Sequence, residues 1–303
     1  VLSGRLKVQV GQHVEYLSEG DSIYYNSSTP HGMIAVDGSE CKFVAVVLPG
    51  EDVAATTVRE TLAPTAKSQP FVCNRFIETT ENENGVPTAI RFKGEEKFNF
   101  AFDIVDEIAK QKPNKLAMLH IDKFGTERRF TFKDMKRASA QCANYFKALG
   151  IQKGDRVMLI LKRHYQFWFA IVGLHKLGAV AIPATNLLQE HDLTYRFNAA
   201  GISAVLCTAD GDVAHQVELA QKESPTLKTK VLVGGSREGW HSFDDEFNLY
   251  SAHYYRTEDT PCGGDPMLMF FTSGTTGYPK IAEHNYKYPL GHYITAKYWH
   301  GVD

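Results

Sequence analysis

The sequence predicts an α/β fold in which helices flank a largely parallel sheet, preceded by a small all-β unit. Two patterns carry this prediction. From about residue 92 onward, short apolar runs alternate with longer segments of helical periodicity, as in βαβ units. Residues 1–50 instead show short alternating segments separated by turn residues. The chain therefore divides by pattern into a β-rich beginning and a larger α/β region.

The β-rich beginning is expected to form part of a sandwich or barrel. Apolar and polar residues alternate strictly in RLKVQV, which is the period of a strand with one buried face. The segments HGMIAV and CKFVAVVL flank Asp37 and Gly38, a pair typical of hairpin turns because glycine tolerates positive φ. Residues 1–50 should therefore contain several short antiparallel strands.

A resemblance refines this expectation. The stretch EGDSIYYNSSTPHGMIAV resembles the second sequence motif of the cupin family, with Pro30 late in the motif and His31 where a metal-binding cupin has its histidine. The resemblance implies a partial cupin-like barrel over residues 1–50, whose first motif would precede Val1. Because a metal site needs three or more convergent ligands and the sequence offers one, we predict no metal site. We expect His31 to be satisfied by hydrogen bonds at a strand end.

Residues 51–91 are predicted to be a connector. The stretch PGEDVAATTVRETLAPTAKSQP has no sustained periodicity and is rich in Thr, Ala and Pro, as linkers often are. The segment that follows, through TTENENGVPTA, is polar and rich in turn residues. The third region, residues 92–303, begins after it.

Residues 92–303 show the alternation of strands and helices most clearly. The expected strands are KLAMLHI, DRVMLIL, AVAIPA, SAVLCT, KVLVG and PMLMFF. The expected helices include FKDMKRASAQCANYFKALG, YQFWFAIVGLHKLG and EHDLTYRFNAAG. In the first of these, Met135, Ala138 and Cys142 begin a series at three- and four-residue steps that ends at Leu149, before a terminating Gly150. This order implies βαβ units and a largely parallel sheet.

The composition indicates a globular protein that acts on small molecules. The 303 residues are 43% hydrophobic and 22% charged, and this length suggests about two domains. The net charge of −2 lacks the excess that binding to nucleic acid or adsorption to a membrane usually requires. We therefore expect small-molecule partners and no nucleic-acid contact from this part.

Cysteine usage and hydropathy bear on the compartment. The five cysteines form no CxxC pair and no metal-spaced cluster with histidine, so we predict neither a disulfide framework nor a zinc site, and we expect a cytoplasmic location. The most apolar stretch, FWFAIVGLHKLGAVAIPAT, is broken by His175 and Lys176 and predicts no membrane span. No signal-peptide pattern opens the chain. A first residue of valine, Val1, suggests a processed, trimmed or partial chain.

The stretch FFTSGTTGYPK, from Phe270 to Lys280, is the candidate ligand-binding loop. It follows an apolar run, so it should begin where a buried strand reaches a sheet edge, which is where α/β proteins bind ligands. A phosphate loop needs glycines for converging backbone N–H groups, hydroxyls as further donors, and a cation. The candidate phosphate-binding residues are Thr272, Ser273, Gly274, Thr275, Thr276, Gly277 and Lys280.

Other interpretations of this loop fit less well. The lysine follows the last glycine by three residues and no Ser or Thr comes after it, so the pattern is not the Walker GxxxxGK[ST] motif. No GxGxxG follows any expected strand, which argues against a Rossmann dinucleotide site. A plain hydrophilic turn of Ser, Thr, Gly and Pro is the remaining alternative.

TSGTTGYPK resembles the signature phosphate loop of the adenylate-forming superfamily, which includes acyl-CoA synthetases, luciferases and peptide-synthetase adenylation domains. The resemblance continues through FNFAFDIVDEIAKQKPNKLAML, RFTFKDMKRASAQCANYFKALGIQKGDRVML and LGAVAIPATNLLQEHDLTYRFNAAGISAVL. Residues 92–303 thus resemble the N-terminal portion of an AMP-binding acyl-CoA synthetase, truncated. IPATNLL, DLTYR and EHNYKYPLGHYITAKYW look most like the acetyl-CoA and medium-chain branch.

The resemblance implies an AMP-forming acid–CoA ligase. ATP and a carboxylic acid would give acyl-adenylate and pyrophosphate, and the thiol of CoA would then displace AMP, with Mg²⁺ sharing the phosphate charge. The loop residues would stabilise the leaving pyrophosphate, with Lys280 as the catalytic point charge. His284 and Tyr286, just past the loop, would either face the substrate channel or have a packing or surface role.

The family motifs that bind adenine, magnesium and ribose, and the C-terminal domain with its catalytic lysine, would lie beyond Asp303. We therefore expect this chain to be inactive by itself. A second hypothesis is a non-catalytic metabolite sensor or scaffold that combines a cupin-like module with a nucleotide-binding half-domain. A phosphate-binding NTPase is a third, with no Walker motif to support it.

Overall fold

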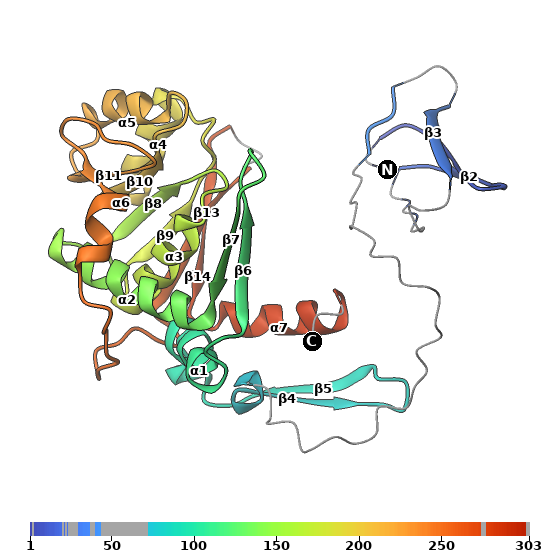
Figure 1. Cartoon of the computed structure of the whole chain (residues 1–303), viewed down its shortest axis with the longest axis horizontal. Coiled ribbons are helices and arrows are strands. Elements are labelled where there is room, and N and C mark those ends of the chain that lie inside the picture. Colours follow the sequence, from blue (N-terminus) through green and yellow to red (C-terminus); the bar gives the residue numbers. More distant parts are fainter. Residues whose placement is uncertain are drawn as a thin grey trace. The chain divides into compact units, whose positions relative to one another are not determined.

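The computed structural model describes residues 72–273 and 277–300, together with residues 1, 3–19, 21, 23, 30–36 and 40–43 (Figure 1). The chain forms two compact units, Val1–Ser68 and Gln69–Asp303. Most of the predicted connector, residues 51–71, lies outside the described residues. Its remainder belongs to the second unit, where it is structured.

The first unit is a small antiparallel sheet, as predicted. Its strands are ordered β2-β1-β3, with β1 at Leu6–Val10, β2 at His13–Leu17 and β3 at His31–Ala35. Leu6 and Val8 of β1 are buried while Gln9 is exposed, so the alternation read from RLKVQV is confirmed. The predicted turn at Asp37 and Gly38 lies outside the described residues.

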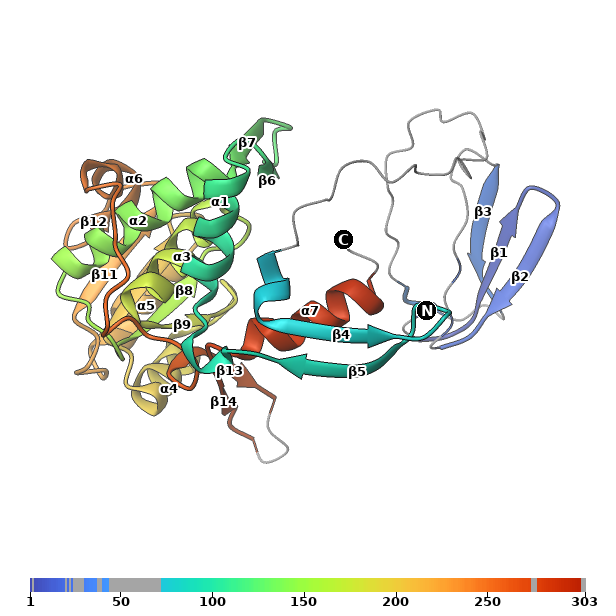
Figure 2. The same ribbon diagram turned by 90° about the horizontal axis from the view of Figure 1, so that it is seen from below.

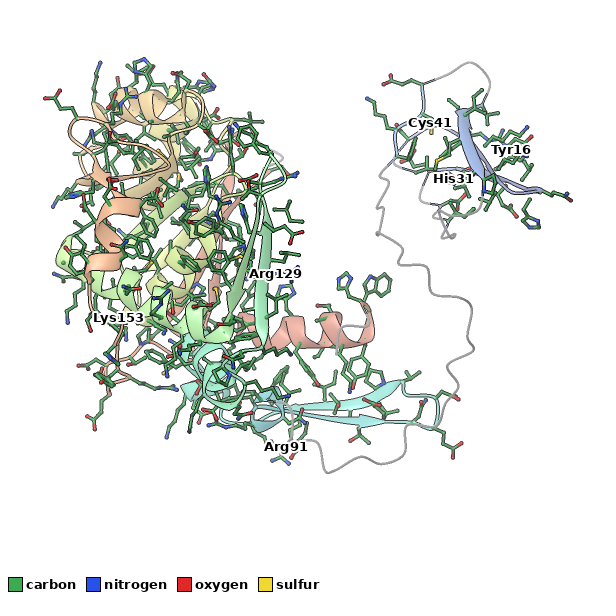
Figure 3. All side chains as sticks on the ribbon, in the orientation of Figure 1. Tyr16, His31, Cys41, Arg91, Arg129 and Lys153 are labelled. Carbon is green, nitrogen blue, oxygen red and sulfur yellow. The ribbon has the colours of Figure 1, made fainter. Side chains whose placement is uncertain are left out.

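His31 is the first residue of β3 and is exposed, so its predicted place at a strand end is confirmed (Figure 3). It lies opposite Val10 in the register with β1. Within the described part of the chain, no group of three or more His, Cys, Asp or Glu side chains could hold a metal ion.

The second unit is built on a seven-stranded sheet with strand order β12-β11-β10-β8-β9-β13-β14. Neighbouring strands are parallel except for the last pair, in which β14 runs antiparallel to β13. The strands are β8 Arg156–Ile160, β9 Val180–Pro183, β10 Ala204–Thr208, β11 Thr229–Val233, β12 His241–Ser242, β13 Pro266–Thr272 and β14 Lys280–Asn285. The predicted, largely parallel sheet is therefore confirmed.

Helices cover both faces of this sheet (Figures 1 and 2). One face carries α2, Phe132–Ala148, and α3, Gln166–Leu177; the other carries α4, Glu190–Ala200, and α5, Val213–Gln221. Strand β8 divides between the two cores: Val157 and Leu159 pack with α2 and α3, whereas Met158 and Ile160 pack with α4 and α5. Burial on both faces explains why these strands are continuous apolar runs in the sequence.

Helix α2 has the apolar face that its sequence predicts. Met135, Ala138 and Cys142 are buried, and the close packing of α2 against α3 depends on Gly173, where a Cβ would lie 2.6 Å from Cys142 Cβ. The helix begins with a capping box in which Thr131 and Asp134 bond reciprocally. It ends before Gly150, which has a φ of 85°.

One expected strand lies outside the main sheet. KLAMLHI contributes β6, Leu116–Ile121, which pairs antiparallel with β7, Glu127–Thr131, in a two-stranded sheet of its own. The turn between them is short, and Asp122 Oδ1 accepts the N–H groups of Phe124 and Thr126, both at 2.9 Å. A connection of this length closes a hairpin and is too short for a parallel crossover.

A second hairpin occupies the end of the predicted connector. Strands β4, Ile77–Glu81, and β5, Pro87–Phe92, lie beside α7, Tyr288–Tyr298 (Figure 2). Lys297 Nζ and Tyr298 Oη of α7 both bond Glu81 Oε1 at 2.7 Å. These contacts join segments more than 200 positions apart, which no local pattern in the sequence reveals.

The remaining elements are short. They are α1 Glu107–Gln111, α6 Phe243–Glu246, the 3₁₀ turns η1 Val72–Arg75, η2 Glu95–Lys97 and η4 Phe247–Leu249, and the π-helical segment η3 Ala101–Asp106. No helix in the described ranges is both long and apolar enough to cross a membrane. Among the cysteines whose side chains the structure describes, Cys41, Cys142, Cys207 and Cys262 are free thiols.

Candidate functional site

The candidate phosphate loop connects the two strands at the sheet's edge. Strand β13 ends at Thr272 and β14 begins at Lys280, and these two residues form the last pair of the register. Thr272 Oγ1 also donates to the Lys280 carbonyl oxygen at 3.3 Å. The loop thus starts where a strand with a buried beginning, Met267 and Leu268, reaches solvent, as the sequence predicts.

The described loop residues have the exposure and conformation that an anion site needs. Thr272, Ser273, Gly277 and Lys280 are all exposed. Gly277 has a φ of 100°, a conformation that L side chains rarely adopt, so the glycine is required there by the backbone. Lys280 forms no ion pair with any residue that the structure describes, which leaves its ammonium group for a ligand. The other three candidates, Gly274, Thr275 and Thr276, lie outside the described residues.

Helix α4 contacts the carboxyl-terminal limb of this loop, which consists of Gly277, Tyr278 and Pro279. Tyr195 Oη donates a hydrogen bond to the Pro279 carbonyl oxygen at 2.9 Å. Its ring also stacks on Tyr278, with the ring centroids 4.7 Å apart and an interplanar angle of 25°. One tyrosine therefore makes a polar and an aromatic contact to consecutive loop residues.

The next residue of α4, Arg196, contacts the amino-terminal limb, which is the end of β13 at Phe271 and Thr272. The guanidinium carbon of Arg196 lies 5.3 Å from the ring centroid of Phe271, within the range of a cation–π contact. Arg196 is itself fixed by Asp192, one turn earlier, whose Oδ1 lies 3.3 Å from the guanidinium and whose carbonyl oxygen accepts at 3.0 Å. The two limbs are therefore held by consecutive residues of one helix.

Helix α4 is itself firmly anchored. Leu193 and Phe197 are completely buried in the core on its side of the sheet. At its start, Gln189 and Asp192 form a reciprocal cap, and at its end Gly201 takes a left-handed conformation with a φ of 57°. A helix with a buried face and both ends satisfied is a rigid support for the loop.

Sequence reasoning missed Tyr195 and Arg196 as loop contacts. The segment DLTYR predicts a helix and resembles one branch of the superfamily, but neither property indicates a contact with the loop. Tyr195 and Pro279 are 84 positions apart, so no local pattern links them. Leu193 and Phe197 define the inward face of the helix, and the helical period places Arg196 on the flank of that face. The same period places Tyr195 on the opposite side of the helix, so it gives no signal for the contact of Tyr195 with the loop.

The two residues just beyond the loop take different positions. Tyr286 is completely buried and its hydroxyl donates to the His175 carbonyl oxygen at 2.9 Å, so it packs in the fold. Burial raises the pKa of Tyr286 well above its usual value. His284 is half-buried, with its ring 4.0 Å from the ring of Tyr288 and 5.6 Å from that of Phe270.

The chain is an α/β protein with a parallel sheet and helices on both faces. Its hydroxyl-rich loop lies at the carboxyl end of β13, which is where proteins of this class bind their ligands. Residues 105–301 match the AMP-binding enzyme family, so the chain belongs to that family. Residues 1–47 match the cupin domain. Both resemblances read from the sequence are confirmed.

Named relatives agree with this assignment. The chain is 36% identical over 214 residues to the human acyl-coenzyme A synthetase ACSM5, mitochondrial, a match that covers 67% of this chain and 36% of the relative. It is 34% identical to the mouse acyl-coenzyme A synthetase ACSM1, mitochondrial, over 66% of this chain and 36% of that one. The chain thus spans just over a third of the length of these curated relatives.

Solved structures share the fold. The anthranilate CoA ligase AuaEII, in complex with anthranoyl-AMP, superposes with a TM-score of 0.61 at 25% identity, over 67% of this chain and 38% of that one. The fatty acyl CoA synthetase of Mycobacterium tuberculosis gives a TM-score of 0.53 at 25% identity, over 62% and 35%. These neighbours are adenylate-forming enzymes, which agrees with the predicted fold class.

Proposed function

We propose that this chain carries the ATP phosphate-binding loop of an AMP-forming acid–CoA ligase. The observation that carries the proposal is the loop from Thr272 to Lys280, whose described residues Thr272, Ser273, Gly277 and Lys280 are exposed. A strand pair closes the base of this loop, and α4 contacts the described residues on both sides of it. Membership of the AMP-binding enzyme family supports the proposal. The candidate ligands are ATP and a carboxylic acid, with CoA as the acyl acceptor.

In the first step, a carboxylate oxygen of the acid attacks the α-phosphorus of ATP. The bond from that phosphorus to the bridging oxygen breaks, and its electron pair leaves with pyrophosphate. The ammonium of Lys280, the hydroxyl of Ser273 and the backbone at Gly277 would stabilise this growing negative charge. The Thr272 hydroxyl would join them by giving up its hydrogen bond to the Lys280 carbonyl oxygen. Mg²⁺, when bound, would neutralise part of the phosphate charge.

In the second step, the sulfur of CoA attacks the acyl carbonyl carbon, the bond from that carbon to the phosphate oxygen breaks, and AMP leaves. We propose that this step needs the part of the relatives that lies outside the match, and that this chain does not complete it by itself. Its own contribution would be to bind the phosphates of ATP through Lys280 and the loop hydroxyls.

The test is ATP–pyrophosphate exchange with a panel of short, medium-chain and aromatic acids. This chain is assayed beside a version extended along its own reading frame, and each is paired with a Lys280→Ala variant. Exchange in the extended version that Lys280→Ala abolishes would support the ligase, and the best acid would name the substrate class. Tight ATP binding without exchange in either version would favour the non-catalytic sensor instead.

A cytoplasmic location and a role in fatty acid metabolism are further proposals. The cysteine usage supports the first, whereas the curated relatives named above carry mitochondrial names. Fractionation of cells that produce the tagged protein distinguishes a cytoplasmic from a mitochondrial location. Co-sedimentation with mitochondria would contradict the cytoplasmic location.

A further inference from the structure

Tyr195 is the side chain through which α4 meets the loop beyond Gly277. We propose that Tyr195 is a positioning residue for the phosphate loop, an inference that rests on the proposed function of that loop. The phenol holds Pro279 by a 2.9 Å hydrogen bond and Tyr278 by ring stacking. It therefore fixes the two residues that immediately precede Lys280.

The hydrogen bond to Pro279 acts directly on Lys280. A proline has no backbone N–H, so its carbonyl oxygen is the one backbone polar group through which it can be held. That carbonyl belongs to the same rigid peptide plane as the nitrogen and Cα of Lys280. Fixing the oxygen therefore fixes the direction in which Lys280 enters β14, where it pairs with Thr272.

The stacking contact adds a second point of support. Tyr278 is 70% exposed, so it owes its position to contacts on one face of its ring, and Tyr195 supplies a nearly parallel ring at 4.7 Å. Two contacts to neighbouring residues prevent the limb from rotating about either one. Across the loop, Arg196 and Phe271 hold the opposite limb.

Tyr195 does not carry the packing of α4. Leu193 and Phe197, at a spacing of four residues, are fully buried and supply the helix's contact with the sheet, while Tyr195 is only half-buried. Removal of the Tyr195 hydroxyl should therefore loosen the loop and leave the helix and the fold intact. This separation makes the inference testable by substitution.

The first readout is deuterium exchange of the amides of residues 277–285 in the whole chain, which needs no ligand. Tyr195→Phe keeps the stacked ring and loses the hydrogen bond, so we expect exchange in this segment to become roughly three- to tenfold faster. Tyr195→Leu loses both contacts and should show a larger increase. Tyr278→Phe is the matched control, because its hydroxyl bonds no described residue and its ring is kept; its exchange should equal that of the wild type.

The second readout is the affinity for magnesium pyrophosphate, measured by titration calorimetry. We expect Tyr195→Phe to weaken the binding of magnesium pyrophosphate by roughly three- to tenfold, the same factor as for exchange. Tyr195→Leu should weaken binding further, and Tyr278→Phe should leave it unchanged. The melting temperature of Tyr195→Phe should remain that of the wild type. If Tyr195→Leu fails to fold, Tyr195→Phe and its control still decide the question.

The two readouts separate the two proposals. Unchanged exchange in Tyr195→Phe would overturn the positioning role, whatever the chain binds. Faster exchange with unaltered pyrophosphate affinity would also overturn it, because the contact would then serve the hairpin and not the ligand. If the wild type binds no magnesium pyrophosphate, the proposed function of the loop fails, while the exchange data still show whether Tyr195 holds it.

Discussion

Lys176 and Asp106 form a buried ion pair in which Nζ of the lysine lies 2.8 Å from Oδ1 of the aspartate. The Lys176 side chain is completely inaccessible to solvent and that of Asp106 is 13% exposed. Burial lowers the pKa of Lys176 and raises that of Asp106, because both charges lose water, while their mutual attraction opposes both shifts. The pair ties α3 to the segment that precedes α1.

We predict that breaking this pair from one side is costly. Lys176→Met should lower the free energy of unfolding by about 3–5 kcal/mol, because it leaves the Asp106 carboxyl buried without its cation. The double variant with Asp106→Leu should recover much of that loss. Urea denaturation measures both. The control is Lys153→Met (Figure 3): the side chains of the Lys153–Asp265 ion pair are 48% and 39% exposed, so this pair should contribute less than about 1 kcal/mol. Equal losses in the two single variants would contradict the prediction.

His175 gives the second unit a stability that depends on pH. Its ring is buried, neither ring nitrogen has a partner among the described residues, and desolvation lowers its pKa from 6.5 to about 3. The unfolded chain therefore binds a proton more readily than the folded chain. The stabilising contribution is fully present above pH 6.5 and is lost as the pH falls from 6.5 toward 3.

We predict that His175→Leu flattens this acid-induced loss. Over that interval the wild type should lose up to a few kcal/mol of unfolding free energy through this group, and the variant should lose correspondingly less. Urea midpoints at pH 7, 5.5 and 4 provide the measurement. Parallel stability curves for the two proteins would show that His175 does not control the acid transition.

Gly173 sets the distance between α2 and α3. A Cβ at this position would lie 2.6 Å from Cys142 Cβ and 3.0 Å from the Ser139 carbonyl oxygen, so Gly173→Ala must push the helices apart. We expect a loss of about 1–3 kcal/mol in unfolding free energy. Gly291→Ala in α7 is the matched control: nothing lies within 4 Å of its added methyl, and we expect a gain of up to about 1 kcal/mol. Thermal denaturation of the two variants should therefore shift in opposite directions.

The sequence predicts those parts of the fold that depend on residues close together along the chain. The alternation in β1, the apolar face of α2 and the strand before the loop are all local patterns. The hairpin of β4 and β5, in contrast, falls within the segment that the sequence predicts to be a connector. Its position depends on Glu81 meeting Lys297 and Tyr298, a contact between segments more than 200 positions apart.

The candidate site likewise has a part that the sequence predicts and a part that only the structure shows. Residue types and spacing are enough to suggest a phosphate loop from Thr272 to Lys280. The support of that loop by Tyr195 depends on how far α4 is rotated over the sheet, which Leu193 and Phe197 settle only after the core has formed. For Tyr286 the sequence leaves a channel role and a packing or surface role open, and its complete burial shows that it packs in the fold.

Lys280 is the residue on which the proposed function depends most directly. Its ammonium is exposed at the start of β14 and pairs with no described carboxylate, so Lys280→Ala should leave the melting temperature unchanged. Because a charge-assisted contact to phosphate is lost, we expect magnesium pyrophosphate to bind roughly 10- to 100-fold more weakly. Lys280→Arg should keep part of the affinity, since the charge remains while the shape of the cation changes.

Calorimetric titration at two salt concentrations measures the loss of affinity in Lys280→Ala, with Lys153→Ala as the control for an exposed lysine away from the loop. Equal affinity in Lys280→Ala and the wild type would remove Lys280 from the phosphate site.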